Sequence, residues 1–158
     1  MDQQPSDPAT RQRGDEEPAG AAAATASLQG LHSPFDALLG TEYVEAGPRR
    51  VVARLRVDER HHQPTGVVHG GVYASVIETV ASIGAWLALD GEGAAMGITN
   101  HTEMLHAVSA GTTLTFTAEP VRTGRTLQLW EVAVTDEHGA PVAHGTVRLF
   151  NQRRAGGG

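Results

Sequence analysis

The architecture of this chain follows from one stretch, residues 63–90, which read QPTGVVHGGVYASVIETVASIGAWLALD. The stretch becomes apolar after two glycines, Gly70 and Gly71, and Glu78 is its only charged residue before Asp90. This spacing predicts a helix from about 70 to 89. Because a carboxylate in mid-span is expensive in lipid, we expect this helix in the core of a folded domain rather than in a membrane.

Shorter elements are predicted on both sides of the long helix. Ser33 suits a helix N-cap, Pro34 the first helical position and Gly40 the end, so a short helix is expected over residues 33–39. Alternating apolar residues bounded by Gly, Asp or Pro predict strands at residues 41–45, 50–57, 94–105, 112–122, 126–135 and 141–150. A helix this apolar must be covered over most of its surface. We therefore expect an α+β fold in which an antiparallel sheet wraps around the central helix.

The length and composition indicate a single globular domain. The chain has 158 residues, of which residues 29–151 are expected to fold. Residues 1–28 are rich in Pro, Ala and charged residues and are expected to form a disordered tail, and residues 152–158 a frayed C-terminus. The net charge of −6 argues against binding to nucleic acid or to an anionic membrane.

Two residue types are missing from the chain, and each absence excludes a class of chemistry. All twelve basic residues are arginines, so a Schiff-base lysine and a P-loop lysine are excluded. There is no cysteine, which excludes thiol nucleophiles, thiolate metal sites and disulfides. A chain without disulfides suits the reducing cytoplasm, which is the expected location.

The start of the long helix is a candidate site for polarising a carbonyl group. The first N–H groups of a helix have no partner within it, and the two glycines leave them open to a ligand. Close packing is the alternative explanation for the same glycines. Glu78 lies two turns along, with Ser82 one turn further on the same face. A lone carboxylate in apolar surroundings is a candidate general base or nucleophile, although most glutamates are simply exposed.

The spacing of these residues has a consequence for the assembly. Gly70 and Glu78 are eight residues apart, which is roughly 12 Å along a helix. One small carbonyl group cannot touch both residues of the same helix. If both act on one substrate, they belong to two antiparallel helices in different subunits. A catalytic role therefore predicts a homodimer with shared sites.

Two other interpretations of this region are less favoured. The tripeptide His69-Gly70-Gly71 is similar to the oxyanion loop of esterases, but the chain has no Gly-x-Ser-x-Gly nucleophile elbow. A metal cluster of His61, His62 and His69 is the second interpretation. Adjacent histidines in a strand point to opposite faces, however, and there is no pair of histidines at helical i, i+4 spacing. No metal site is predicted.

The residues singled out at the long helix form one pattern with two residues that precede it: Gln63, Gly66, His69-Gly70-Gly71, Glu78 and Ser82. This pattern resembles that of the hotdog-fold acyl-CoA thioesterases, in particular the Arthrobacter-type 4-hydroxybenzoyl-CoA thioesterase and its phenylacetic-acid-pathway relatives. Two further segments resemble the same branch, Thr99-Asn100-His101-Thr102 and Gly124-Arg125-Thr126. The resemblance covers about residues 40–150. It implies a hotdog fold, a homodimer or dimer of dimers with shared active sites, and hydrolysis of acyl- or aryl-CoA to the free acid and CoA. It implies no cofactor, because CoA is part of the substrate.

The resemblance also implies a role for each matching position. The Gly70 N–H polarises the thioester carbonyl and Gln63 helps to position it. Glu78 of the facing subunit attacks the thioester or activates water, and Ser82 orients the water or the nucleophile. The remaining positions are expected to bind substrate, and they are His69, Gly71, Asn100, His101, Gly124, Arg125 and Thr126.

The phosphates of CoA need local arginines, because the chain is acidic overall and has no lysine. Arg125 is the first candidate, since its turn brings backbone N–H groups and a guanidinium together. Arg122 and Arg148 come next, and a plain solvated arginine is the alternative in each case. Two other functions stay open, a non-catalytic hotdog protein that binds a ligand or acts as a scaffold, and a thioesterase that acts on acyl carrier protein.

Overall fold

The computed structural model describes residues 32–153. The elements in that range, in chain order, are α2 (Pro34–Leu39), β1 (Thr41–Ala46), β2 (Val51–Arg56), the 3₁₀-helix η2 (Glu59–His61), α3 (Gly70–Leu87), β3 (Gly93–Met104), β4 (Thr113–Thr123), β5 (Leu127–Thr135) and β6 (Pro141–Arg153). The tail predicted for residues 1–28 lies outside the described residues, as do residues 154–158 of the predicted C-terminal end.

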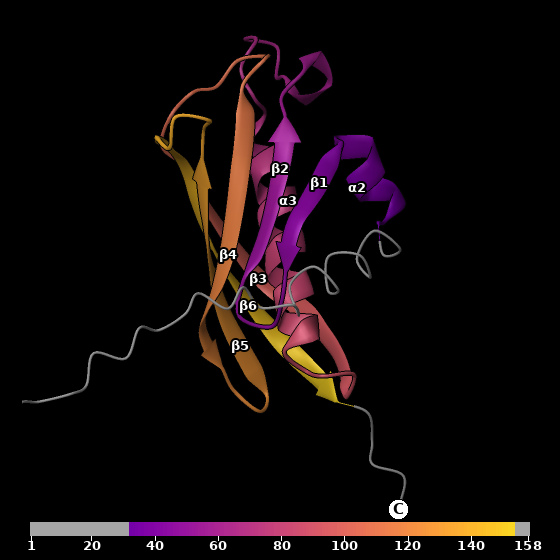
Figure 1. The fold of residues 1–158 in the computed structure, drawn as a ribbon. Coiled ribbons are helices and arrows are strands. Elements are labelled where there is room, and N and C mark those ends of the chain that lie inside the picture. Colours follow the sequence, from indigo (N-terminus) through magenta and orange to yellow (C-terminus); the bar gives the residue numbers. More distant parts are fainter. Residues whose placement is uncertain (1–31, 154–158) are drawn as a thin grey trace, which may run out of the picture.

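The six strands form one antiparallel sheet in the order β1-β2-β4-β5-β6-β3. β3 directly follows α3 in the chain but pairs with β6 at the far edge, so β1 and β3 are the two edge strands. Figure 1 shows the sheet curving around α3, with α2 beside β1. The structure thus confirms the predicted antiparallel sheet around one central helix.

Glycines set the distance between α3 and the sheet. A Cβ atom at Gly84 would lie 2.5 Å from the ring of Trp130, and one at Gly145 would lie 2.6 Å from Ile77 Cγ2. Both distances are shorter than any normal carbon contact, so these positions exclude a side chain. The sheet contributes the other side of the core through every second residue of its strands, as the sequence predicts. In β5 the buried residues are Gln128, Trp130, Val132 and Val134.

The predicted boundaries agree with the structure to within two residues, except at the end of β6. That strand continues to Arg153 rather than ending at 150, because its last residues pair with the start of β3, where Gly93 lies opposite Arg153. His61 and His62 lie outside the six strands, so the strand geometry used to weigh the metal cluster does not apply to them. The Asp58 side chain accepts from the Arg60 N–H, and this cap begins the 3₁₀-helix η2, which includes His61.

α3 is apolar enough to resemble a membrane span by composition alone. Its 18 residues have a mean hydropathy of 1.2, which meets the criterion of length and hydropathy for crossing a bilayer. In this fold α3 occupies the concave face of the sheet instead, and Ile77, Val80 and Ala81 are fully buried there. The apolar composition is accounted for by the core.

Candidate active site

A cavity of about 590 Å³ opens between α2, α3 and the first residues of β3. Two of the predicted catalytic residues, Glu78 and Ser82, line it from α3. The complete lining consists of Ser33, Phe35 and Asp36 at α2, of Ser75, Glu78, Thr79, Ser82, Ile83 and Trp86 on α3, and of Ala94 and Ala95 on β3. One carboxylate on the helix thus faces a space with aromatic and aliphatic walls.

Glu78 presents an unpaired carboxylate to this cavity. Among residues 32–153 no ion pair or hydrogen bond engages it. The hydroxyl protons nearby are taken by the helix backbone, because Ser75 Oγ donates to Gly71 O at 2.7 Å and Thr79 Oγ1 donates to Ser75 O at 2.9 Å. Gly97 of β3 lies against the carboxylate, and a Cβ atom there would be 2.7 Å from Oε1. The missing side chain at Gly97 therefore makes room for the Glu78 carboxylate.

Ser82 and Trp86 continue the same wall of the cavity along α3. Ser82 lies one turn beyond Glu78, as the spacing predicts, and the described structure contains no hydrogen bond between the two side chains. Trp86 lies a further turn along and is 38% exposed. Trp86 was not among the predicted site residues, although its spacing of four residues from Ser82 places both on one helical face.

The start of α3 has one capped and one open N–H group. His69 is the N-cap residue, and its Nδ1 accepts from the Gly71 N–H at 2.9 Å. Nδ1 therefore carries no proton in this arrangement. The Gly70 N–H has no acceptor within the described part of the chain. The predicted oxyanion donor is available, whereas the Gly71 N–H is satisfied by the imidazole of His69.

Gln63 lies in the loop that leads into α3. Its backbone N–H bonds to Val67 O at 2.9 Å, and its carbonyl accepts from the Gly66 N–H at 2.9 Å. The turn requires glycine at position 66, where φ is 82°. The side-chain Nε2 donates to Thr65 Oγ1 at 3.0 Å, which leaves the amide oxygen free to accept.

The predicted catalytic residues, together with His69 of the predicted substrate-binding set, fall into two separate groups in one protomer. Glu78 and Ser82 line the cavity, whereas Gly70, Gln63 and His69 do not. Both groups lie along β3, because a Cβ atom at Gly70 would be 3.2 Å from Met104 Cε and Glu78 lies against Gly97. We call these groups the Glu78 half-site and the Gly70 half-site.

Asn100 and His101, the two residues of β3 predicted to bind substrate, have different surroundings in the protomer. Asn100 Nδ2 donates to Ala74 O of α3 at 2.8 Å, and Asn100 Oδ1 accepts from Thr102 Oγ1 at 2.8 Å. Asn100 thereby ties the middle of β3 to α3 between the two half-sites. His101 is exposed, and its Nε2 lies 3.4 Å from Glu103 Oε1.

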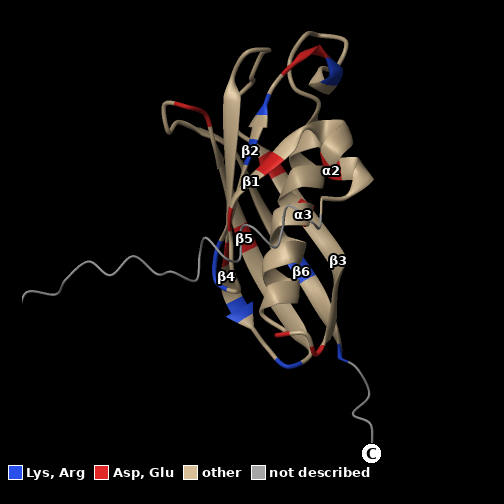
Figure 2. Ribbon diagram, turned by 45° about the vertical axis from the view of Figure 1, so that its right-hand side comes forward, with Lys and Arg blue, Asp and Glu red and all other residues tan. Residues whose placement is uncertain are grey.

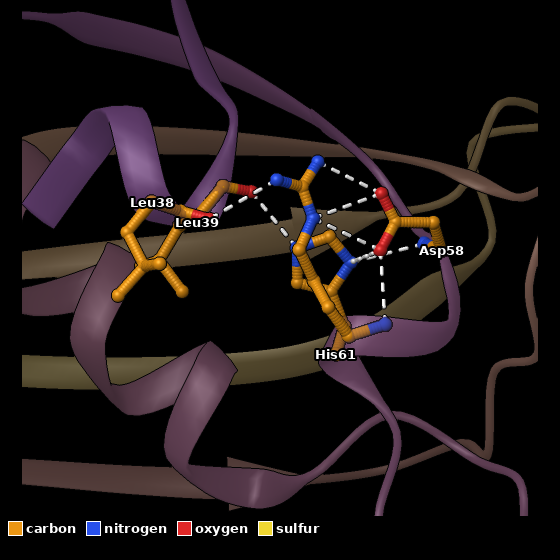
Figure 3. A network of polar contacts seen from close by, with 5 residues as sticks. Leu38, Leu39, Asp58 and His61 are labelled. Atoms are coloured by element: carbon orange, nitrogen blue, oxygen red, sulfur yellow. Dashed lines mark hydrogen bonds and ion pairs between the residues drawn. The ribbon is translucent and has the colours of Figure 1, made fainter.

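A polar network holds α2, and hence the far wall of the cavity, against η2 (Figure 3). The Asp58 N–H donates to His61 Nδ1 at 2.9 Å, so the ring proton is on Nε2, which donates to Leu39 O at 2.8 Å. Arg60 bonds to Leu38 O at 3.3 Å and forms an ion pair with Asp58 at 2.8 Å. The hydrogen bonds from Arg60 lower the pKa of the Asp58 carboxyl group.

The same network is continuous with the start of α3. The carbonyl of buried His61 accepts from the His69 N–H at 2.8 Å. Both ring nitrogens and the carbonyl of His61 are thus bonded within the protein, which gives His61 a structural role. Within residues 32–153 no group of three or more His, Asp or Glu side chains is placed to hold a metal ion.

The turn between β4 and β5 borders a second, basic groove of about 390 Å³. All three arginines proposed for phosphate binding line it, Arg122, Arg125 and Arg148, together with Gly124 and Thr126. None of the three guanidiniums forms an ion pair with a described residue. Figure 2 shows basic segments at the end of β4 and on β6. The turn residues and the predicted arginines thus line one groove, which shares no lining residue with the Glu78 cavity.

Sequence reasoning missed the contribution of α2 to the cavity. Phe35 and Asp36 line it although they precede Glu78 by about forty residues. Asp36 also forms a capping box with Ser33, whose N–H and hydroxyl both bond to Asp36 Oδ2. The cap was readable from the sequence, but its position beside α3 depends on the contacts of η2 with the α2 carbonyl groups.

Known proteins share both the sequence and the fold. The chain is 46% identical over 121 residues to a Mycobacterium tuberculosis protein that is named an esterase, which covers 75% of this chain and 86% of that relative. The solved structure of the M. tuberculosis protein matches with a TM-score of 0.75 at 43% identity, covering 78% of this chain and 99% of that one.

Two further relatives have more specific names. The 1,4-dihydroxy-2-naphthoyl-CoA hydrolase of Listeria monocytogenes is 36% identical over 99 residues, which is 63% of this chain and 80% of the relative. The proofreading thioesterase EntH of Cronobacter turicensis is 35% identical over 101 residues, or 64% and 73%. Residues 65–143 match the family profile described as thioesterase superfamily. With its hotdog fold and these relatives, the chain belongs to the thioesterase superfamily of hydrolases.

Proposed function

We propose that this protein hydrolyses acyl- or aryl-CoA thioesters to the free acid and CoA, with Glu78 as general base or nucleophile. The observation that supports this most is the unpaired Glu78 carboxylate in a cavity to which Phe35, Ile83 and Trp86 contribute aromatic and aliphatic surface. Such a space receives an acyl group while the carboxylate faces the reacting carbon. The naphthoyl-CoA hydrolase among the relatives supports the same substrate class.

A homodimer through β3 would complete the site. β3 is an edge strand of 12 residues, and an unpaired edge of this length is a template for pairing with another chain. Met96, Ile98 and Met104 of β3 are exposed and about half of their surface or more is open to solvent in the single protomer. Pairing would cover apolar surface that is costly to leave in water.

The positions of the two half-sites suggest the register of that pairing. We place the two-fold axis near Asn100 and His101, with the two β3 strands antiparallel. Residue 97 of one copy then faces residue 104 of the other. Because Glu78 lies beside Gly97 and Gly70 beside Met104, the Glu78 half-site of one subunit meets the Gly70 half-site of its partner.

The reaction follows from the groups so assembled. The Gly70 N–H donates to the thioester oxygen and stabilises the negative charge that develops there. Glu78 takes a proton from a water that attacks the carbonyl carbon, or attacks that carbon itself to give an anhydride that water then cleaves. In both routes the C–S bond breaks, and the CoA thiolate leaves and takes up a proton. Ser82 orients the attacking group and the Gln63 amide positions the carbonyl. CoA is part of the substrate, and the proposed route needs no metal or organic cofactor.

The groove at the β4–β5 turn is the proposed site for the CoA phosphates. Its three arginines supply positive charge where the chain as a whole is acidic. Arg125 comes first, because it lies in the turn itself, where guanidinium and backbone N–H groups converge on an anion. We place the activity in the cytoplasm, which suits a chain without cysteine.

Glu78→Gln tests the proposal directly. The variant keeps the shape of the side chain and removes its basicity, so kcat on benzoyl-CoA should fall by about 10²–10⁴-fold while the fold is retained. Release of free thiol is the readout. Glu131→Gln, which changes an exposed glutamate on β5, is the matched control and should keep wild-type activity.

Three outcomes of this assay separate the possible functions. A Glu78→Gln variant within about threefold of wild type would remove Glu78 from the mechanism. A wild-type protein that binds acyl-CoA but never turns it over would be a non-catalytic hotdog protein. If the wild-type protein hydrolyses only the thioester of acyl carrier protein, then acyl carrier protein and not CoA is the carrier in its substrate.

A further inference from the structure

Asn151 of β6 holds the whole turn between β4 and β5. Its backbone N–H donates to Thr126 O at 2.8 Å. Its side-chain Nδ2 donates to Gly124 O at 2.8 Å and to Arg125 O at 3.2 Å. All three carbonyl groups of the turn are therefore bonded by one residue, which is itself only 5% exposed.

The amide oxygen of Asn151 is held by a hydrogen bond from the buried side chain of Gln128. Asn151 Oδ1 accepts from Gln128 Nε2 at 2.9 Å, and the same Nε2 donates to Ala85 O of α3 at 3.0 Å. Gln128 Oε1 accepts from the Trp130 indole N–H at 3.0 Å. The bonds leave only one orientation for each amide, and a buried network with its donors and acceptors satisfied is rigid.

The direction of these bonds determines what the turn offers to the groove. In a trans peptide the carbonyl and the following N–H point in opposite directions, and the described residues contain no cis peptide. With the carbonyls of Gly124 and Arg125 turned toward Asn151, the N–H groups of Arg125 and Thr126 are turned away from it. Neither N–H has an acceptor among residues 32–153.

Two open N–H groups beside a free guanidinium form an arrangement that binds anions. We infer that Asn151 is a positioning residue for substrate binding, which fixes the Gly124–Thr126 turn so that it receives the phosphates of the CoA nucleotide. The inference rests on the proposed function. Asn151 does not touch the nucleotide itself. Through Gln128 and Ala85 it also ties this turn to the last turn of α3, which carries Trp86 of the acyl cavity.

Replacing Asn151 should weaken binding of the nucleotide and leave the chemistry intact. The test compares Asn151→Ala with wild type on benzoyl-CoA and on S-benzoylpantetheine, which lacks the nucleotide. KM for benzoyl-CoA should rise about threefold to tenfold, the factor expected for one lost hydrogen bond, with kcat and the pantetheine KM within about twofold of wild type. Gln152→Ala is the matched control, since it removes an exposed amide from the neighbouring position of β6, and it should change neither KM.

A purely structural role would give a different result. An equal rise of KM for both substrates, or no rise for benzoyl-CoA, would overturn the inference. If Asn151→Ala does not fold, Asn151→Ser replaces it and should show the same selective rise. Amide hydrogen exchange of the wild-type protein gives a second test without any variant. CoA should slow exchange at Arg125 and Thr126 and pantetheine should not, and an absence of slowing by CoA would overturn the inference.

Failure of the inference and failure of the proposed function are distinguishable. CoA binding needs no turnover, so the Kd for CoA is measured on wild type and on Asn151→Ala whether or not a thioester is cleaved. A wild-type protein that binds CoA through this turn but hydrolyses no thioester refutes the proposed function alone. An active enzyme whose Asn151→Ala variant treats CoA and pantetheine substrates alike refutes the inference alone.

Discussion

Gly97→Ala should lower kcat by displacing the Glu78 carboxylate, while the chemical identity of the Glu78 side chain stays the same. The new Cβ atom would lie 2.7 Å from Glu78 Oε1, where ordinary contacts begin at 3.4 Å, so the carboxylate must move by about 0.7 Å. A displacement of about 1 Å in a reacting group costs on the order of 10²-fold in rate, so we expect kcat to fall roughly tenfold to a hundredfold. The unfolding temperature should hardly change, because φ at Gly97 is not positive and the methyl meets only the end of an exposed side chain.

A double-mutant cycle shows whether this contact is the cause. Glu78→Asp withdraws the carboxylate from β3 by one methylene and lowers kcat by itself. Adding Gly97→Ala to it should cost little more, since the clash is already relieved, and the two effects should be clearly non-additive. The kcat of all four proteins on benzoyl-CoA is the measurement, with light scattering to show that the oligomeric state is unchanged. A Gly97→Ala enzyme with wild-type kcat, or one whose loss is the same in both backgrounds, would refute the reasoning.

Three further predictions concern the phosphates, the shared site and the buried tyrosines. Arg125→Ala should raise KM for benzoyl-CoA about threefold to tenfold, and an equal rise for S-benzoylpantetheine would contradict phosphate binding. Equal mixing of inactive Glu78→Ala and Gly70→Pro subunits should restore about a quarter of the wild-type activity, because half of the dimers contain one intact site; no recovery after proven exchange would exclude sharing. Burial raises the pKa of Tyr73 to about 12, and burial together with Asp36 raises that of Tyr43. The folded state favours the neutral phenols, so this stability is complete below about pH 10 and is lost as the pH rises toward 12. Tyrosinate absorbance should therefore appear well above pH 10, and a normal titration near pH 10 would contradict the burial of the phenols.

Local sequence patterns predicted the elements of this fold because each pattern has a local physical cause. The apolar run after Gly70 and Gly71 predicted α3, and Ser33 with Gly40 predicted both ends of α2. Glu78 and Ser82 share a cavity because residues four apart lie on one face of a helix. None of these inferences required knowledge of residues far away in the chain.

The rest of the site depends on tertiary contacts, and some of it was still readable. Phe35 and Asp36 reach the cavity only because η2 binds the α2 carbonyl groups, and the 3₁₀-helix itself has no clear sequence signal. Asn151 was placed at the last position of the predicted domain, just beyond the strand expected to end at 150, although it has the same parity as the buried Leu149 of β6. A polar residue in phase with the core face of a strand indicates a buried hydrogen-bond network.

The attachment of α2 has a consequence for how this scaffold diversifies. Arg60 donates a hydrogen bond to the backbone carbonyl of Leu38, and His61 donates one to that of Leu39. These backbone carbonyls are present whatever side chains the segment carries. Residues such as Phe35 are therefore free to change in size and shape without loosening the attachment. Since the proposed general base or nucleophile, Glu78, lies on α3 and not on α2, grafting a different α2 sequence should exchange one acyl preference for another while turnover is preserved. The cavity is in that sense modular, with an interchangeable wall on α2 beside a fixed wall on α3.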